Sequence, residues 1–281
     1  MKKNKRIVAS LLAAAGLALP AVGQSEASVT ADFSAPQTPV SKNLFGIFYE
    51  DINYAADGGL YGEMVQNRSF EFSASNNSST EGWKDHINIS GQRAKSRLKA
   101  NKTGGLNKNN PTYAKFKAQA AGDGFSNKGY KGMFFEEGKT YPGSVYLRSA
   151  DGSVSSMTVT IGADDSSAKV ATTQITGITK EWKKYEFSLT AAANTYNGKI
   201  ALYADQAGEV DVDFVSLFMA DIYKNEPNGL RKDLAEMLEA MHPAFIRFPG
   251  GCIVHGHWLA DRYQWKNTIG PVENRPLNEN R

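Results

Sequence analysis

The first strong run of apolar positions lies at residues 43–52, after a weaker alternating run at 29–33. Aliphatic and aromatic side chains dominate the stronger run, at the density typical of a buried strand. Two acids, Glu50 and Asp51, follow these side chains directly. The pattern therefore predicts a buried strand that ends on a pair of carboxylates.

From residue 82 to 219 the pattern changes to short β-like runs separated by Gly, Asn, Asp and Ser. No helical period lies between the runs, and their lengths fit the strands of a β-sandwich. The region is about 140 residues long, an ordinary size for one domain. The clearest runs are Ser144–Arg148, Ser156–Ile161, Trp182–Leu189, Lys199–Tyr203 and Val210–Phe218. We therefore expect an all-β domain with the architecture of a β-sandwich.

A helical period replaces the strand pattern at residues 230–241, where apolar side chains recur three or four positions apart. Asn228 is the candidate N-cap of this helix, and Pro243 ends it. A short apolar strand, Ala244–Phe248, follows and leads into a Pro-Gly-Gly turn at 249–251. The order strand, insert, helix, strand predicts a parallel crossover with the sandwich placed between the first strand and its helix.

The first 27 residues have the pattern of a secretory signal peptide. A basic start precedes the apolar run Ile7–Leu19, and Pro20 and small residues follow it. The apolar run is too short to span a bilayer. We therefore expect export to the periplasm or the extracellular space, with no stable membrane insertion after cleavage.

The net charge excludes one class of partner. The chain has 281 residues, 41% of them apolar, and a formal charge of +3. Four basic residues lie in the first six positions, and the charge without them is −1. A nearly neutral protein has no electrostatic attraction for phosphate backbones, so we expect no nucleic-acid partner.

Metal and cofactor chemistry also find little support in the sequence. Cys252 is the only cysteine, which rules out an internal disulfide. His255 and His257 alternate as if on one strand face, but no third ligand stands at a suitable spacing. The sequence has no recognisable Ser-His-Asp arrangement or phosphate-binding loop. We therefore predict no metal among the site residues and no cofactor.

Two separated stretches carry a family resemblance. The first reads Phe-Gly-Ile-Phe-Tyr-Glu-Asp-Ile at 45–52 and continues with Gly-Gly-Leu-Tyr at 58–61 and Asn-Arg-Ser-Phe-Glu at 67–71. The second reads Phe-Ile-Arg-Phe-Pro-Gly-Gly-Cys at 245–252. In this order they resemble the amino-terminal part of the family 51 glycoside hydrolases, the α-L-arabinofuranosidases.

The resemblance implies an α/β plus all-β protein: an incomplete (β/α)8 barrel interrupted by the sandwich. It also implies retaining release of terminal arabinofuranose from arabinan or arabinoxylan. Glu50 would accept hydrogen bonds from sugar hydroxyls, and Gly250, Gly251 and Cys252 would line the same pocket. The family's acid/base and nucleophile glutamates lie on later strands and have no counterpart here. We therefore expect no catalytic residue in this chain, and an amino-terminal fragment that hydrolyses nothing by itself.

Structural roles remain open for the same residues. Glu50 could be a solvated strand end, and a free cysteine such as Cys252 is often a small buried hydrophobe. Asp51 and Glu71 could serve as salt-bridge or cap partners. Arg247 could orient a carboxylate within the barrel.

The sandwich carries a looser resemblance of its own. Residues 141–148 and 211–218, with Trp182 and Tyr185, resemble CenC-like carbohydrate-binding modules. The resemblance implies a jelly roll that binds glycans through aromatic faces, and the candidates here are Trp83, Tyr113, Tyr130 and Phe135. We assign Trp182, Tyr185 and Phe187 mainly to packing. A structural Ca²⁺ is conceivable in this domain, with Asp211 or Asp213 as the ligand.

These expectations combine into one domain plan and two functions. The first function is an α-L-arabinofuranosidase acting on an arabinose-containing plant polysaccharide or oligosaccharide. The alternative is a non-catalytic glycan-binding protein that uses the sandwich. The predicted plan is a signal peptide at 1–27, the start of the barrel at 28–75, the binding module at 76–220 and the barrel's continuation at 221–281.

Overall fold

The computed structural model describes residues 27–34, 38–72, 80–86, 98–164, 169–227 and 229–277. The chain divides into two compact units, Met1–Ser41 and Lys42–Arg281, and every described helix and strand belongs to the second. Most of the predicted signal peptide, the Ser/Asn-rich boundary after Phe72 and the predicted cap Asn228 lie outside the described residues. Within the described ranges, no helix has the length and apolar character needed to cross a bilayer.

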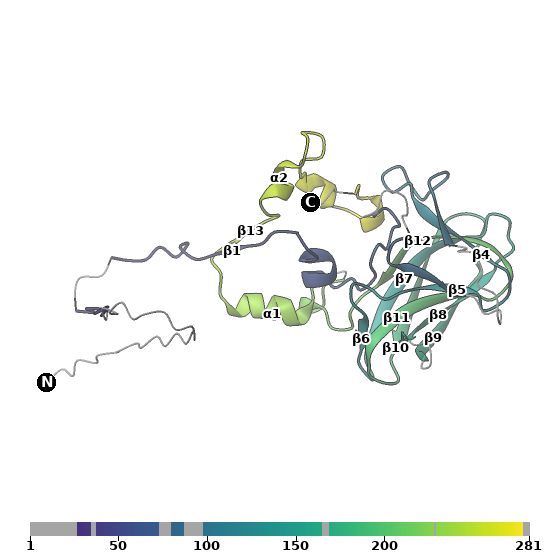
Figure 1. Ribbon diagram of the computed structural model, residues 1–281, viewed down its shortest axis with the longest axis horizontal. Coiled ribbons are helices and arrows are strands. Elements are labelled where there is room, and N and C mark those ends of the chain that lie inside the picture. The colour runs from purple at the N-terminus through teal and green to yellow at the C-terminus, as the bar shows by residue number, and fades with distance from the viewer. Residues whose placement is uncertain are drawn as a thin grey trace, which may run out of the picture. The chain divides into compact units, whose positions relative to one another are not determined.

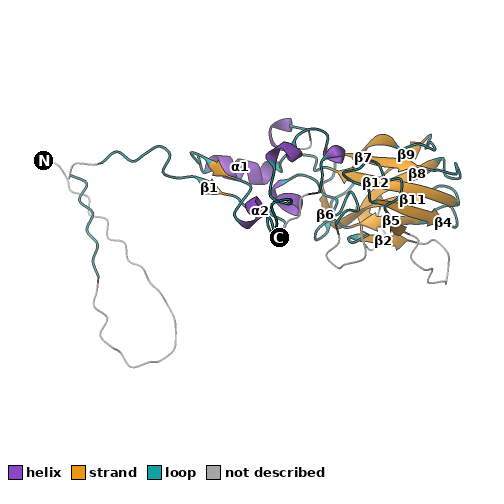
Figure 2. Cartoon of the chain, turned by 90° about the horizontal axis from the view of Figure 1, so that it is seen from above, coloured by secondary structure: helices purple, strands orange, loops and turns teal. Residues whose placement is uncertain are grey.

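A two-sheet antiparallel sandwich makes up most of the second unit (Figures 1 and 2). One sheet has the strand order β10-β7-β12-β4-β3, and the other has the order β2-β5-β11-β8-β9, with β6 added against β11. The predicted all-β domain is therefore confirmed. Its strands are β2 (Trp83–His86), β3 (Leu98–Asn101), β4 (Tyr113–Ala118), β5 (Gly124–Asn127), β6 (Met133–Phe135), β7 (Thr140–Arg148), β8 (Ser156–Ala163), β9 (Lys169–Thr176), β10 (Lys183–Thr190), β11 (Thr195–Ala204) and β12 (Gly208–Leu217).

Side chains that alternate along the strands fill the space between the two sheets. In β10, Tyr185, Phe187 and Leu189 are buried, and the residues between them are exposed. This period of two places one apolar face of each sheet toward the other. The packing role predicted for Tyr185 and Phe187 is confirmed. Trp182 lies just before β10, and its ring packs edge-on against Tyr113 with centroids 5.4 Å apart.

The sandwich leaves and rejoins the rest of the chain at one place. Glu63, on the way in, forms an antiparallel bridge with Phe218, on the way out. The Met64 N–H donates to the carbonyl of Leu217 (2.9 Å), and the Met219 N–H donates to the carbonyl of Gly62 (3.1 Å). The β-domain is therefore an insertion whose two connections hydrogen-bond to each other.

The remaining elements surround one parallel strand pair, β1 (Ile47–Phe48) and β13 (Ile246–Arg247). A helical turn, η1 (Ala56–Leu60), follows β1, and helix α1 (Lys232–Ala240) precedes β13. The chain then continues through η3 (Trp265–Thr268) and η4 (Val272–Asn274), after the short helix α2 (Cys252–His255). A further turn, η2 (Tyr223–Asn225), lies between the sandwich and α1. The order strand, insert, helix, strand is as predicted.

Two details of the predicted elements are wrong. Helix α1 begins at Lys232 rather than at Leu230, because Leu230 instead forms an antiparallel bridge with Tyr61. The strand at 43–52 was expected to be long and buried, but β1 covers two residues and Phe48 is exposed. Among the described residues only β13 pairs with β1, and no larger sheet surrounds this pair to bury Phe48.

The segment after η3 is attached to the sandwich by an asparagine cluster. The Asn110 side-chain amide donates to the carbonyls of Glu273 (2.9 Å) and Arg275 (2.8 Å). Asn107 and Asn109 donate to the carbonyls of Glu273 and Asn274, both at 2.6 Å. Each amide satisfies a backbone acceptor that would otherwise need water. The cluster therefore joins residues more than 160 positions apart in sequence.

Candidate functional site

The carboxyl ends of β1 and β13 bring the two predicted site segments together (Figure 1). The Tyr49 N–H donates to the carbonyl of Arg247, and the Asp51 N–H donates to the carbonyl of Pro249, both at 2.9 Å. These bonds extend the parallel pairing beyond the two short strands. Parallel strands end at the same edge, so Glu50 and the turn after Phe248 become neighbours.

The Glu50 carboxylate is held by backbone amides of that turn. Its Oε1 accepts hydrogen bonds from the N–H groups of Gly251 and Cys252, each at 3.0 Å. The side chain is half-buried. The structure therefore brings together all four residues predicted for the sugar site, namely Glu50, Gly250, Gly251 and Cys252. Whether they bind sugar is a separate matter.

Gly250 is needed for this close approach. A Cβ atom at Gly250 would lie 2.3 Å from Cγ of Glu50, and its φ of +145° is a conformation that side chains rarely adopt. Gly251 is less crowded, since a Cβ there would lie 3.5 Å from Oε1 of Glu50. The Pro-Gly-Gly turn thus allows the backbone to pass directly against the carboxylate. The peptide bond between Phe248 and Pro249 is cis.

Cys252 and Arg247 do not have the structural roles that were considered for them, a buried apolar residue and a partner for a carboxylate. Cys252 is exposed, so it is not a small buried hydrophobe, and its contact with Glu50 is made by its backbone. The Arg247 guanidinium lies over the Phe48 ring, 4.8 Å from the centroid, which is a cation–π contact.

Among the described residues, no group of three or more His, Cys, Asp or Glu side chains could hold a metal ion.

The loop after β1 contains acids whose charges interact. Burial raises the pKa of Asp51, and the nearby charge of Asp57 raises it further. Burial, together with these two acids, raises the pKa of Tyr49 to about 12. The Tyr49 hydroxyl is buried and has no hydrogen-bond partner in the described part of the chain. It lines a mostly apolar hollow of about 460 Å³ between the strand pair and α1.

A second hollow, of about 650 Å³, lies between the loop after β1 and the sandwich. Tyr54, Tyr61, Tyr130 and Phe134 are among its lining residues. Glu50 lines neither of these two hollows.

Most of the aromatic residues predicted to bind glycan on the sandwich are core residues. Trp83 and Phe135 are buried in the core between the sheets, and Tyr113 is buried on the other face of β4 beneath Trp182 and Arg148, so this part of the prediction is wrong. Of the predicted set, only Tyr130 lines a hollow. The exposed aromatic pair is instead Phe134 and Tyr196. Alternation along a strand could have separated Phe134 from Phe135, but it could not have shown which of the two faces solvent.

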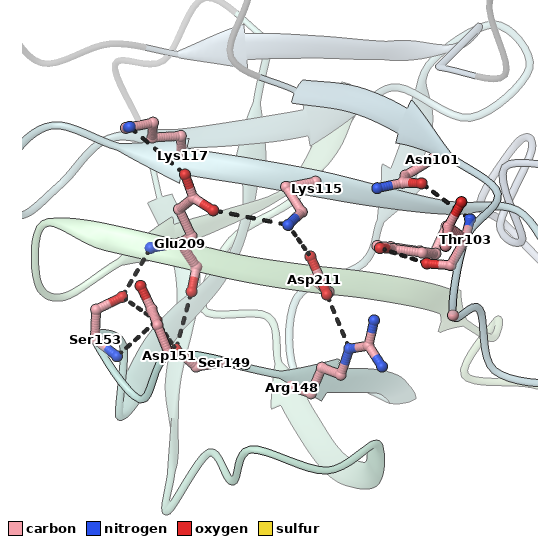
Figure 3. A network of polar contacts seen from close by, with 12 residues as sticks. Asn101, Thr103, Lys115, Lys117, Arg148, Ser149, Asp151, Ser153, Glu209 and Asp211 are labelled. Carbon is pink, nitrogen blue, oxygen red and sulfur yellow. Dashed lines mark hydrogen bonds and ion pairs between the residues drawn. The ribbon is translucent and has the colours of Figure 1, made fainter.

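The two candidate calcium ligands lie in very different surroundings. Asp211 accepts a hydrogen bond from Arg148 Nε (2.8 Å) and lies 3.8 Å from Lys115 Nζ (Figure 3). Two cations already neutralise it, so it does not fit a calcium site. Asp213 is buried, and its Oδ2 has no hydrogen-bond partner among the described residues. Burial raises its pKa to about 9, and the charge of Glu71 adds to the shift.

Glu71 takes one of the structural roles considered for it. Its two carboxylate oxygens accept hydrogen bonds from the backbone N–H (2.6 Å) and the hydroxyl (2.7 Å) of Thr112. It therefore fixes the start of β4 from the segment before β2. Asp213 thus keeps one buried carboxylate oxygen without a partner among the described residues, while both oxygens of Glu71 are occupied by Thr112.

The fold and site together define a modular α/β protein, in which a strand-end carboxylate meets a glycine turn and a β-sandwich is inserted after the first strand. Residues 237–281 match the alpha-L-arabinofuranosidase 1 domain. The chain is 40% identical over 287 aligned residues to the extracellular exo-α-L-arabinofuranosidase of Streptomyces chartreusis, covering 96% of this chain and 33% of that protein. It is 36% identical to α-L-arabinofuranosidase 1 of Arabidopsis thaliana, covering 85% of this chain and 35% of that one.

A solved structure agrees with these sequences. The arabinose-bound GH51 α-L-arabinofuranosidase superposes with a TM-score of 0.76 at 29% identity, covering 86% of this chain and 40% of that one. By sequence, the chain belongs to the α-L-arabinofuranosidase family of glycoside hydrolases. It spans about a third of the length of the two relatives named above.

Proposed function

We propose that this chain supplies the sugar-orienting part of a retaining α-L-arabinofuranosidase. The observation that supports the proposal is the Glu50 carboxylate, fixed by the amides of Gly251 and Cys252 where two parallel strands end. Both of these bonds go to Oε1, and no described residue donates to Oε2. An ionised carboxylate with one oxygen fixed and one available is suited to accept hydrogen bonds from sugar hydroxyls.

In this proposal the chain binds and orients arabinofuranose but does not cleave the glycosidic bond. Retaining hydrolysis needs an acid/base and a nucleophile, with carboxyl groups about 5–5.5 Å apart. The resemblance provides no match for either glutamate in this chain. Gly250 and Gly251 let the backbone approach the ring, and Glu50 holds the ring's orientation. The substrate is an arabinose-containing plant polysaccharide or oligosaccharide, as the names of the relatives suggest.

The proposed domain plan is the one predicted from the sequence pattern. Residues 28–75 and 221–281 form the start of an incomplete (β/α)8 barrel, and residues 76–220 form an inserted carbohydrate-binding module. The hydrogen-bonded connections at Glu63 and Phe218 support an insertion at this point. Residues 1–27 direct export, which is in keeping with the extracellular relative. No nucleic acid and no stable membrane insertion form part of the proposal.

A structural Ca²⁺ bound by Asp213 is a further part of the proposal for the sandwich. The support is the unpartnered Oδ2 and the raised pKa of a carboxyl group that burial keeps from ionising. A bound cation would favour the ionised form and supply the missing contact. Asp211 has no place in this site, because Arg148 and Lys115 neutralise it.

A chimera tests the main proposal. Residues 28–281 are joined to the remaining two-thirds of the Streptomyces chartreusis relative, and release of 4-nitrophenol from 4-nitrophenyl α-L-arabinofuranoside is measured. Glu50→Gln should lower kcat/KM about 10- to 100-fold, since a charge-assisted hydrogen bond contributes about 1.5–3 kcal/mol. The matched control is Glu226→Gln, in an exposed turn.

Two results would contradict the proposal. An active chimera that is indifferent to Glu50→Gln would remove the role of Glu50. Release of arabinose by the purified 281-residue chain alone would show that it contains catalytic carboxyl groups after all.

The second function, glycan binding by the sandwich without hydrolysis, is favoured by one observation. Phe134 and Tyr196 expose adjacent rings on the module, with centroids 5.2 Å apart. Apolar ring faces on a protein surface suit the C–H faces of sugars. Binding of an oligosaccharide by the chain, together with an inactive chimera, would favour this function over the first.

A further inference from the structure

The hollow of about 650 Å³ has the size of a ligand site but lies away from Glu50. One wall comes from the loop after β1, including Tyr54 and Gly58, and the other comes from the sandwich, with Tyr130 in the turn before β6 and Phe134 in β6. Side chains from both the barrel segment and the module are therefore needed to form it.

The loop after β1 adopts a costly backbone conformation that presents Tyr54. Asn53 and Tyr54 have consecutive positive φ angles of 52° and 65°, which are uncommon for side chains of this kind. Such strain persists where the surroundings hold it in place, and it is concentrated at functional sites. Here the Tyr54 ring lies edge-on to Tyr130, with centroids 5.2 Å apart. More than half of the Tyr54 side chain remains exposed.

Glycines keep the space around these rings open. A Cβ at Gly58 would lie 2.5 Å from the Tyr130 ring, and a Cβ at Gly59 would lie 2.3 Å from the Tyr54 carbonyl oxygen. Both approaches are shorter than any real side chain tolerates, so glycine is required at these two positions. The two tyrosines therefore depend on the glycine turn for their arrangement.

A β-bulge presents the second aromatic pair at the edge of the hollow. Strand β6 pairs with β11, and the register shifts between Thr195 and Gly198. A bulge re-aims side chains and is frequent beside functional sites. Tyr196 lies within this shift and is 80% exposed, and its ring packs against Phe134, which lines the hollow. The aromatic surface thus continues from the hollow onto the sandwich.

The charges around the hollow largely neutralise one another. Lys139 pairs with Asp221 at 2.9 Å, and Arg231 pairs with Asp233 at 2.6 Å. Lys131 and Glu136 leave one charge of each sign. The buried Glu63 is paired with Arg68, which lies behind the lining. A site with aromatic faces, polar edges and no net charge selects a neutral, hydroxyl-rich ligand over an ionic one.

We propose that this hollow is a second glycan-binding site that holds a neutral oligosaccharide between the inserted sandwich and the loop after β1. The Tyr54 and Tyr130 rings contact the sugar inside the hollow, and Phe134 and Tyr196 extend the contact along the chain of sugars. The choice of plant oligosaccharides as probes rests on the proposed function. The site itself does not depend on hydrolysis or on Glu50.

Calorimetric titration of the purified chain tests the proposal with three five-unit probes: an arabino-oligosaccharide, a xylo-oligosaccharide and an anionic galacturonic-acid oligosaccharide. At least one neutral probe should bind, and the anionic probe should bind at least tenfold more weakly. Tyr54→Ala and Phe134→Ala should each weaken binding of the neutral probe about tenfold. Tyr54→Phe keeps the ring and should retain affinity, which separates lost contact from misfolding.

Two controls place the binding in the hollow. Trp265→Ala removes an exposed ring elsewhere and should leave affinity unchanged. The titration is repeated on the Glu50→Gln variant, in which binding of arabinofuranose at the strand-end carboxylate is weakened, and the binding that remains should still depend on Tyr54 and Phe134. The proposal is overturned if no neutral probe binds, if the anionic probe binds equally well, or if binding survives both alanine substitutions.

Discussion

Glu63 fixes the point where the sandwich is inserted, and replacing it should destabilise the whole second unit. The side chain is 3% exposed. Its Oε1 accepts hydrogen bonds from the N–H groups of Val65 (3.0 Å) and Leu217 (2.9 Å), and its Oε2 accepts one from the Ser216 hydroxyl (2.5 Å). Arg68 Nη1 lies 3.4 Å from Oε2. One carboxylate therefore joins the incoming and the outgoing connections of the insert.

The protonation state decides what a substitution removes. Burial raises the pKa of Glu63 above its ordinary value, although the Arg68 charge and the three hydrogen bonds oppose this shift. In return, although burial lowers the pKa of Arg68, the Glu63 charge raises it above the ordinary value. Every neighbour of the carboxylate donates a hydrogen or carries positive charge, so Glu63 acts as an anion.

Glu63→Gln keeps the size of the side chain but removes the charge. The amide oxygen of the new glutamine can still accept hydrogen bonds from the N–H groups of Val65 and Leu217. Its NH₂ group, however, would face the guanidinium of Arg68. Removing one member of a buried ion pair costs about 3–5 kcal/mol. Arg68 keeps some exposure and the ion pair is long, so we expect a loss near the lower end, about 2–4 kcal/mol.

Urea unfolding of the purified chain measures this loss, with Glu226→Gln as the matched exposed control. A double-mutant cycle with Arg68→Met isolates the pair: the double variant should be less destabilised than the sum of the two single losses. A loss below about 0.5 kcal/mol for Glu63→Gln, or strict additivity in the cycle, would refute the view that this pair holds the insertion together.

Three further substitutions test other parts of the structure. Because burial raises the pKa of Asp213 to about 9, the cation-free protein should lose stability as the pH rises from about 4 to about 9, and Asp213→Asn should remove that loss in thermal melts. Added Ca²⁺ should raise the melting temperature of the parent at pH 8 but not that of the Asn variant. Asn110→Ala removes the donor to the Arg275 carbonyl and one of the two donors to the Glu273 carbonyl, and it should speed hydrogen exchange at the Arg275 amide at least tenfold, with a smaller change in global stability. Gly250→Ala should cost about 1–3 kcal/mol in urea unfolding and lower chimera activity as Glu50 is displaced, and unchanged values for both would contradict the crowding.

The sequence predicts the larger organisation because each part has its own hydrophobic period. The alternation along β10 and β12 marks the sandwich, and the helical spacing marks α1. The pairing of β1 with β13 follows from the family resemblance and is confirmed. The start of α1 is misplaced, because only the tertiary pairing of Leu230 with Tyr61 removes that residue from the helix.

Site-level features are harder to predict, because burial decides between chemically similar residues. Phe134 and Phe135 are neighbours of the same type, yet only Phe134 faces solvent. Asp211 and Asp213 share a face of β12, yet the first has two cationic partners and the second has an unpartnered oxygen. The sequence pattern could not distinguish the members of either pair. The surroundings of each residue are set by cross-strand neighbours in β4, β7 and β11, which are distant in sequence.

The attachments of the sandwich limit how far the two proposed glycan sites can move apart. Glu63 joins the two connections of the sandwich. The asparagine cluster holds the segment around η4 against the sandwich. The Tyr146 hydroxyl also holds this segment, since it donates to Glu273 at 2.7 Å. A domain joined only by its two chain ends could swing about them, whereas a third attachment from a distant part of the chain opposes that rotation. The segment that follows β1 contributes Glu50 and also Tyr54, in the loop that forms one wall of the hollow. An oligosaccharide held there would therefore keep a fixed position relative to the strand-end carboxylate, and Asn110→Ala should loosen that position while leaving the affinity of the hollow, measured by calorimetric titration, unchanged.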